Sequence, residues 1–122
     1  MGAVAVRHDP ASAALVRRVL SEELSTTTIG PDRIADVVLV ASELVGNAVV
    51  HTDSGDLDIG WTVEATAVTV WVSDASPVIP EQRVADAADT SGRGLAIVAA
   101  VAAEWGVEPL GTGKRVWARV AV

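Results

Sequence analysis

The stretch ASELVGNAVVH, residues 41–51, decides the fold assignment because it sets three polar side chains at a constant spacing inside an apolar helical pattern. That pattern begins at Asp32, a residue type that caps helices, and runs to about residue 50. Glu43, Asn47 and His51 lie four residues apart, and four residues of helix advance by about 400°, so the three side chains share one face. A helix this apolar is expected to be largely buried, which leaves little room for a solvated stripe.

The chemistry of this stripe is that of hard ligands. A carboxylate at Glu43 and an amide oxygen at Asn47 suit Mg²⁺, which binds through few protein groups together with substrate phosphates. On an ordinary surface helix the same spacing would be only a polar face, and that alternative stays open.

Composition restricts the class of protein. The chain has 122 residues, which suits a single domain over 1–122 with one core. Half of the residues are hydrophobic, but Phe and Tyr are absent, so the core must consist of small aliphatic side chains and four Trp. The absence of Cys excludes a disulfide scaffold, a thiolate nucleophile and a Cys-ligated zinc site. The net charge of −7 opposes binding to the phosphate backbone of nucleic acids. An acidic surface either binds a basic protein partner or simply keeps the protein in solution, and both alternatives stay open.

The sequence also predicts the surroundings in which the protein works. The longest apolar run, residues 95–103, is far shorter than the ~20 residues that cross a bilayer. The first residues lack the long apolar region of a secretory signal. We therefore expect a soluble, cytoplasmic protein with no membrane partner.

The expected elements follow the order strand, helix, helix, strand, strand, loop, helix, strand, strand. Because helices do not separate successive strands, a doubly wound parallel sheet is excluded. The sequence predicts an α+β, two-layer sandwich whose mixed, mostly antiparallel sheet is covered on one face by about three helices. The first half of the chain is predicted to form a strand 2–7, helices 11–25 and 32–50, and strands 57–64 and 67–74. A loop 75–91 follows. A third helix opens after Gly92 and runs through the segment GRGLAIVAAVAAEW, and strands 106–110 and 115–122, joined by the turn GTGK, end the chain.

Two further signals follow along the chain. In SGRGLAIV, residues 91–98, Gly92 and Gly94 flank the start of a helix, where free N–H groups and the helix dipole suit a phosphate. An ordinary turn is the alternative. Asp74 ends an expected strand, where its carboxylate can accept a hydrogen bond from an exocyclic amine such as that of adenine, or simply start a turn. Only the joint order of these signals is specific.

In that order, the motifs resemble the GHKL superfamily of ATP-binding domains, shared by gyrase, Hsp90, histidine kinases and MutL. The closest resemblance is to the anti-sigma-factor serine kinases of bacterial stress and sporulation switches. SELVGNAVVH matches the N box, VSDASPVIP the adenine-contacting strand end and the start of the ATP lid, GRGLAIV the next glycine box, and GTGKRVWARV the terminal hairpin. The likeness spans nearly the whole chain and implies the histidine-kinase-like ATPase fold.

The resemblance implies a role for each matched residue. Asn47 would coordinate a Mg²⁺ ion that bridges the phosphates of ATP, and Glu43 would orient or deprotonate the serine hydroxyl of a partner protein. His51 would line the nucleotide pocket, and Asp74 would recognise the adenine amine. The phosphates would lie at the helix start formed by Gly92, Arg93, Gly94 and Leu95.

The function implied by the resemblance is that of an ATP- and Mg²⁺-dependent serine protein kinase. It would phosphorylate a STAS-type anti-sigma antagonist and sequester a sigma factor, and family analogy adds a homodimer. A sensor histidine-kinase catalytic domain is a further reading. It is disfavoured because no dimerisation helix with a phosphoacceptor His precedes the motifs.

A contact-only regulatory module, with structural or lost nucleotide binding, is the alternative from a different class. Two departures from the family pattern favour it. The lid starts with a glycine-poor segment, residues 74–77, in place of Asp-x-Gly-x-Gly, and Arg115 stands where related proteins often carry a Thr near the adenine. Gly46 is unusual in another way, since glycine inside a helix costs about 1 kcal/mol relative to Ala; it indicates either close packing or tolerance.

Overall fold

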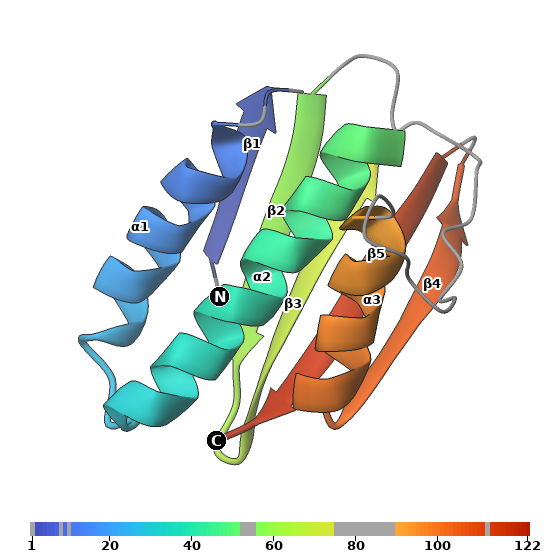
Figure 1. Ribbon diagram of the computed structural model, residues 1–122. Coiled ribbons are helices and arrows are strands. Elements are labelled where there is room, and N and C mark those ends of the chain that lie inside the picture. Colours follow the sequence, from blue (N-terminus) through green and yellow to red (C-terminus); the bar gives the residue numbers. More distant parts are fainter. Residues whose placement is uncertain (1, 8, 10, 52–55, 75–89, 112) are drawn as a thin grey trace.

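The computed structural model describes residues 2–7, 9, 11–51, 56–74, 90–111 and 113–122. The elements within these ranges are β1 (Gly2–Arg7), α1 (Ser12–Leu24), α2 (Pro31–His51), β2 (Asp56–Val63), β3 (Ala67–Asp74), α3 (Thr90–Val101), β4 (Glu104–Leu110) and β5 (Gly113–Ala121). The strands form one sheet in the order β1-β2-β3-β5-β4, and the helices cover one of its faces (Figure 1). The predicted α+β sandwich is thereby confirmed.

The sheet is simpler than the sequence predicts. All four strand pairings are antiparallel, so the described strands form an antiparallel sheet and not a mixed one. The reason is that β3 and β5, which are separated by α3 and β4 in the chain, still run in opposite directions side by side. The predicted alternation of β2 and β3 is confirmed, because Leu57, Ile59 and Trp61 are buried on the same face as Val70 and Val72.

The third helix differs from its prediction at both ends. We expected it to open after Gly92 and to run through Trp105, but it starts at Thr90 and ends at Val101. Beyond it, residues 104–110 form β4, where Trp105 and Val107 lie two residues apart and both pack against the core, as on one face of a strand. The preceding Ala- and Val-rich run hides this change of period in the sequence. The predicted loop 75–91 lies outside the described residues except for its last two, which belong to α3.

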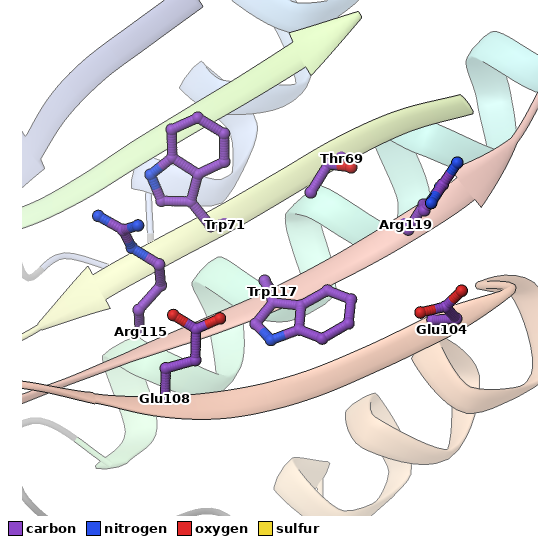
Figure 2. Close-up of a pocket in the computed structure, with 7 residues that line it drawn as sticks. All are labelled: Thr69, Trp71, Glu104, Glu108, Arg115, Trp117 and Arg119. Atoms are coloured by element: carbon purple, nitrogen blue, oxygen red, sulfur yellow. The ribbon is translucent and has the colours of Figure 1, made fainter. Parts of the chain in front are cut away.

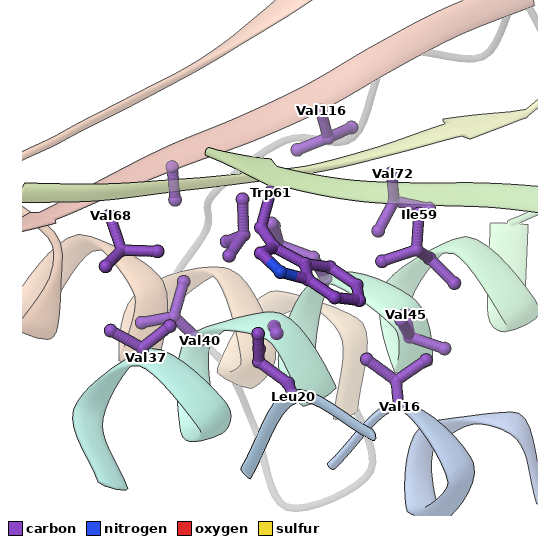
Figure 3. Close-up of a cluster of buried hydrophobic side chains, with 14 of the residues drawn as sticks. Val16, Leu20, Val37, Val40, Val45, Ile59, Trp61, Val68, Val72 and Val116 are labelled. Atoms are coloured by element: carbon purple, nitrogen blue, oxygen red, sulfur yellow. The ribbon is translucent and has the colours of Figure 1, made fainter. Parts of the chain in front are cut away.

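The core lies between the sheet and α2, the middle helix of the covering layer (Figure 1). This helix packs against α1, α3, β3 and β5. Trp61 is 1% exposed and lies at the centre of the core, with Leu20 of α1 and Val40 of α2 facing it across the layer (Figure 3). Each buried aliphatic side chain contributes about 1.5–3 kcal/mol, so many small side chains replace the missing Phe and Tyr.

Three of the four tryptophans lie directly opposite a glycine on the neighbouring strand. A Cβ atom added to Gly60 would overlap the Trp71 indole, so the ring occupies the space of the missing side chain. The other rings are placed in the same way. The three register pairs are Gly2 with Trp61, Gly60 with Trp71, and Gly106 with Trp117.

We expect Gly60→Ala to lower the free energy of unfolding by about 1–3 kcal/mol, because the new methyl group must displace the Trp71 indole. Gly46→Ala is the matched control. A Cβ there meets no described atom within 4 Å, which favours tolerance over close packing, and the change should stabilise α2 by up to about 1 kcal/mol. Urea unfolding of both variants measures the difference; an equal effect of the two substitutions would contradict the role of the ring.

Candidate functional site

Apart from Glu43, which lies near the middle of α2, the polar residues singled out from the sequence lie at or near element ends that meet at one end of the sandwich. There α2 ends at His51, β3 ends at Asp74 and α3 begins at Thr90, with the start of β5 beside β3 (Figure 1). The antiparallel pairing of β3 with β5 and the packing of α2 against both strands and α3 bring these ends together. Residues far apart in the chain therefore share one region.

Asn47 provides the clearest sign of a binding site. Its side chain is on α2 and the residue is only 4% exposed, yet no group in the described part of the chain donates a hydrogen bond to its Oδ1 atom. Leaving a buried polar atom unsatisfied costs about 1–3 kcal/mol, and such atoms are uncommon in proteins. The position therefore suits a ligand that supplies a donor or a cation.

Glu43 lies one helical turn before Asn47 and is half-buried. It is among the residues lining a surface hollow of about 570 Å³ between α1 and α2, together with the exposed Leu39 and with Arg17 of α1. The carboxylate thus belongs to a surface that a macromolecule can approach, whereas the amide of Asn47 is enclosed. The helical stripe joins an accessible acid to a buried amide oxygen.

The remaining predicted nucleotide contacts are only partly described. His51 is the last residue of α2, and its side chain lies outside the described part, as does that of Arg93, while Gly92 and Gly94 belong to the first turns of α3. Gly92 is the third residue of α3, so its N–H lacks a helical acceptor, whereas the N–H groups of Arg93 and Gly94 fall within the helical ladder. The Leu95 side chain is 1% exposed and packs into the interior.

Asp74 is held by a residue that the sequence analysis did not single out. Lys114 is its register partner on β5, and the Lys114 Nζ donates to Asp74 Oδ1 at 3.0 Å. The side chains are 0% and 2% exposed for Asp74 and Lys114, so this is a buried ion pair. The alternation of Val116, Ala118 and Val120 could have revealed it, because extending that pattern back by two residues puts position 114 on the core face.

The prediction for Arg115 was wrong. Its side chain lies on the outer face of the sheet, where the guanidinium is 5.5 Å from the centroid of the Trp71 ring and Nε donates to Ser73 Oγ at 3.3 Å. Neighbouring residues of a strand point to opposite faces, so Arg115 lies away from Asp74. The residue beside the predicted adenine-recognising carboxylate is Lys114.

The outer face carries a shallow hollow of about 350 Å³ (Figure 2). Its lining residues are Thr69, Trp71, Glu104, Glu108, Arg115, Trp117 and Arg119. The hollow lies across the sheet from Asp74 and takes no part in the candidate site.

The described residues contain neither a cluster of metal-binding side chains nor a membrane-spanning helix. No group of three or more His, Asp or Glu side chains is placed to hold a metal ion. Magnesium needs no such group, because it commonly keeps several waters and binds one or two protein ligands plus phosphate oxygens. Among the described helices, none is long and apolar enough to cross a membrane.

We expect Lys114→Met to lower the free energy of unfolding by about 3 kcal/mol, because it leaves the Asp74 carboxylate buried without its ammonium partner. The double variant Asp74→Asn/Lys114→Met should lose less, since neither charge is then buried. Arg115→Met, on the other face, should cost less than about 1 kcal/mol. Chemical denaturation of the wild type, the single variants Asp74→Asn and Lys114→Met and the double variant completes a double-mutant cycle, with Arg115→Met as the control. Purely additive single effects would show that the pair is not coupled.

Comparison with known proteins adds an independent finding. Residues 6–120 match the family model described as the histidine kinase-like ATPase domain. A search of curated proteins found no significant match.

Two bacterial proteins are among the solved structures similar to the chain. One is the crystal structure of the RsbU and RsbW domains of Rv1364c from Mycobacterium tuberculosis, with a TM-score of 0.73 and 21% identity over 100% of this chain and 33% of that one. The other is the Acinetobacter baumannii histidine kinase AdeS, with a TM-score of 0.53 and 13% identity over 99% of this chain and 68% of that one. The chain thus spans a third of the length of the mycobacterial chain, and at these identities the likeness shows the fold.

Proposed function

The chain belongs to the histidine kinase-like ATPase domain family, and on that premise we propose that it is an ATP- and Mg²⁺-dependent serine protein kinase. The resemblance drawn from the sequence motifs is confirmed at the level of this family. Beyond family membership, we propose the kinase activity, the Mg²⁺ ion and the partner proteins.

The observation that carries the proposal is the buried Oδ1 atom of Asn47, which accepts no hydrogen bond from the described residues. An amide oxygen is a ligand that Mg²⁺ accepts, so the residue fits the predicted metal. When bound, Mg²⁺ would neutralise charge on the phosphates that develops during transfer. Phosphate oxygens would be held by the free N–H groups at the start of α3.

Glu43 supplies the acid–base chemistry in this proposal. Its carboxylate takes the proton of the partner's serine hydroxyl as the serine oxygen bonds to the γ-phosphorus. The bond between the γ-phosphorus and the oxygen bridging to the β-phosphate breaks, and ADP leaves. The half-buried position beside the hollow between α1 and α2 supports this role, because a protein substrate can reach it.

For partners, we propose a STAS-type anti-sigma antagonist as the phosphorylated protein and a sigma factor as the sequestered one, in the cytoplasm, with the kinase as a homodimer. The support is the motif resemblance to anti-sigma-factor kinases and the shared fold with an RsbW domain. The four matched sequence boxes, and not the fold alone, point to this branch.

The second candidate is a contact-only regulatory module. The buried Asp74–Lys114 pair favours it, because Oδ1 of the carboxylate expected to recognise adenine already accepts a hydrogen bond from a charged donor. The two candidates differ in whether ATP changes the affinity for the partner protein. A contact-only module should bind its partner equally well with and without ATP.

We expect calorimetric titration with ATP and Mg²⁺ to show micromolar-range binding by the wild type, and Asn47→Ala to weaken it by about tenfold or more. Ser42→Ala is the control, since Ser42 is a buried polar residue of the same helix whose hydroxyl donates to the Leu39 carbonyl instead. Wild-type protein that binds no ATP would overturn the proposal and leave the contact-only module.

We expect Glu43→Gln to keep ATP binding but to reduce phosphoryl transfer to a STAS-domain antagonist by about 10²–10⁴-fold, because the amide cannot take the serine proton. Glu22→Gln, on the exposed side of α1, should transfer phosphate at the wild-type rate. Transfer of radiolabelled γ-phosphate measures both. Equal activity of Glu43→Gln and the wild type would remove Glu43 from the reaction.

A further inference from the structure

The outer face of the sheet, opposite the helices, carries two tryptophans at its centre. Trp71 of β3 and Trp117 of β5 are register partners, and with Gly60 and Gly106 on the flanking strands they form one row across the sheet. Figure 2 shows the ring faces of both indoles turned outward. A sheet face that meets water normally carries polar side chains, whereas partly exposed tryptophans are enriched at protein interfaces. The row therefore indicates a surface that binds a protein.

The charged side chains beside this row are sorted by strand. On β5, Arg115 and Arg119 lie on either side of Trp117 and form a basic column. On β4, Glu108 is the register partner of Arg115 and Glu104 is that of Arg119, so the two acids form an acidic column. The outer face thus holds a basic column directly beside an acidic one.

The two columns do not pair with each other within the chain. The Arg115 guanidinium lies 5.5 Å from the centroid of the Trp71 ring, and its Nε donates to Ser73 Oγ at 3.3 Å. Arg119 pairs with Glu64 at 3.9 Å, but these side chains are 41% and 50% exposed, so the contact contributes little. In the described part of the chain, neither acid of the acidic column joins an ion pair or a side-chain hydrogen bond. Both acids are exposed and available to positive charges on another chain.

A second copy of the chain fits this face because the two columns are self-complementary. In a two-fold symmetric dimer the same surface of each copy meets the other. An axis that runs along the strands, between β4 and β5, places the basic column of each copy over the acidic column of the other. The net charge of −7 opposes the association of identical chains, and these opposite charges offset that repulsion locally.

The same axis also brings the two copies of Trp117 together. The Trp117 indole reaches from β5 across Gly106 of β4, where an added Cβ would lie only 3.0 Å from it. The ring therefore lies at the axis, where it can stack on its copy. Two stacked rings between two sheets give successive contacts of about 3.5 Å, which is close to the ~10 Å spacing of packed sheets.

We propose that the outer face of the sheet is the interface of a homodimer, in which Arg115 and Arg119 of each copy pair with Glu108 and Glu104 of the other. The two Trp117 rings stack at its centre. This inference rests on the proposed function for the homodimer itself and adds the surface that forms it. Because the helices lie on the opposite face, the candidate site and the hollow between α1 and α2 stay accessible in both copies.

Sedimentation velocity of the full chain tests the interface with two charge-reversed variants. We expect the wild type to dimerise with a dissociation constant in the micromolar range. Glu104→Arg/Glu108→Arg carries bases in both columns, and Arg115→Glu/Arg119→Glu carries acids in both. The dissociation constant of each variant alone should rise by about 100-fold or more, because every contact then joins like charges.

An equal mixture of the two variants should form a heterodimer, since every contact between them joins opposite charges. This recovery cannot arise within one chain, because the two columns of each variant still carry like charges. Glu22→Arg/Glu23→Arg is the matched control. It reverses two acids on the exposed side of α1 and should dimerise as the wild type does. Circular dichroism establishes that each variant is folded.

Where a charge reversal does not fold, a milder change replaces it. Glu104→Gln/Glu108→Gln only neutralises the acidic column and should weaken the dimer by about tenfold or more. A wild type that stays monomeric at about 100 µM would overturn the inference. Folded variants that dimerise as tightly as the wild type, or a mixture of the two reversed variants that stays monomeric, would do so as well.

Titration with ATP separates this inference from the kinase proposal. Wild-type protein that binds ATP as a monomer overturns the interface and leaves the kinase in place. Wild-type protein that dimerises through the outer face without binding ATP overturns the kinase and leaves the interface in place.

Discussion

The packing of α2 onto the middle of the sheet is the constraint on which the rest of the structure depends. This helix contacts both neighbouring helices, the central strand β3 and its neighbour β5, so most of its circumference is enclosed. A polar residue on such a helix is either satisfied by a partner or exposed at a site. Ser42 is satisfied by its own helix, while Asn47 keeps a buried oxygen with no donor from the described residues. The same packing that stabilises the domain thus makes the amide available to a ligand.

The core has to achieve that packing without Phe or Tyr. Valine, leucine and alanine fill most of it, and Trp61 supplies the one large ring at the centre (Figure 3). Glycines opposite three tryptophans let the rings lie across the neighbouring strand, on the inner face for Trp61 and on the outer face for Trp71 and Trp117. The indoles therefore cover backbone that small side chains would leave exposed, which stabilises the sheet on both faces.

Adjacent residues of β5 lie on opposite faces of the sheet and have different contacts. Lys114 faces inward and pairs with Asp74, whereas Arg115 faces outward and lies over Trp71. Both are cations next to one another in the chain, and only their direction distinguishes a residue of the candidate site from a residue of the outer surface. A buried pair of this kind is weak evidence for stability, since replacing both partners by apolar groups is often neutral. The pair lies at the ends of β3 and β5, within the candidate site.

The sequence predicted the sandwich, most element boundaries and the helical stripe of Glu43 and Asn47, because local periodicity and the order of motifs carry that information. It missed the end of α3, where an apolar run hides the change from a helical to a strand period. It also missed Lys114, which it assigned to a turn. The sequence by itself determined on which elements the candidate residues lie. Only the tertiary structure decided that β5 pairs with β3 in the register that buries Lys114 against Asp74, because strand pairing depends on contacts between segments 40 residues apart.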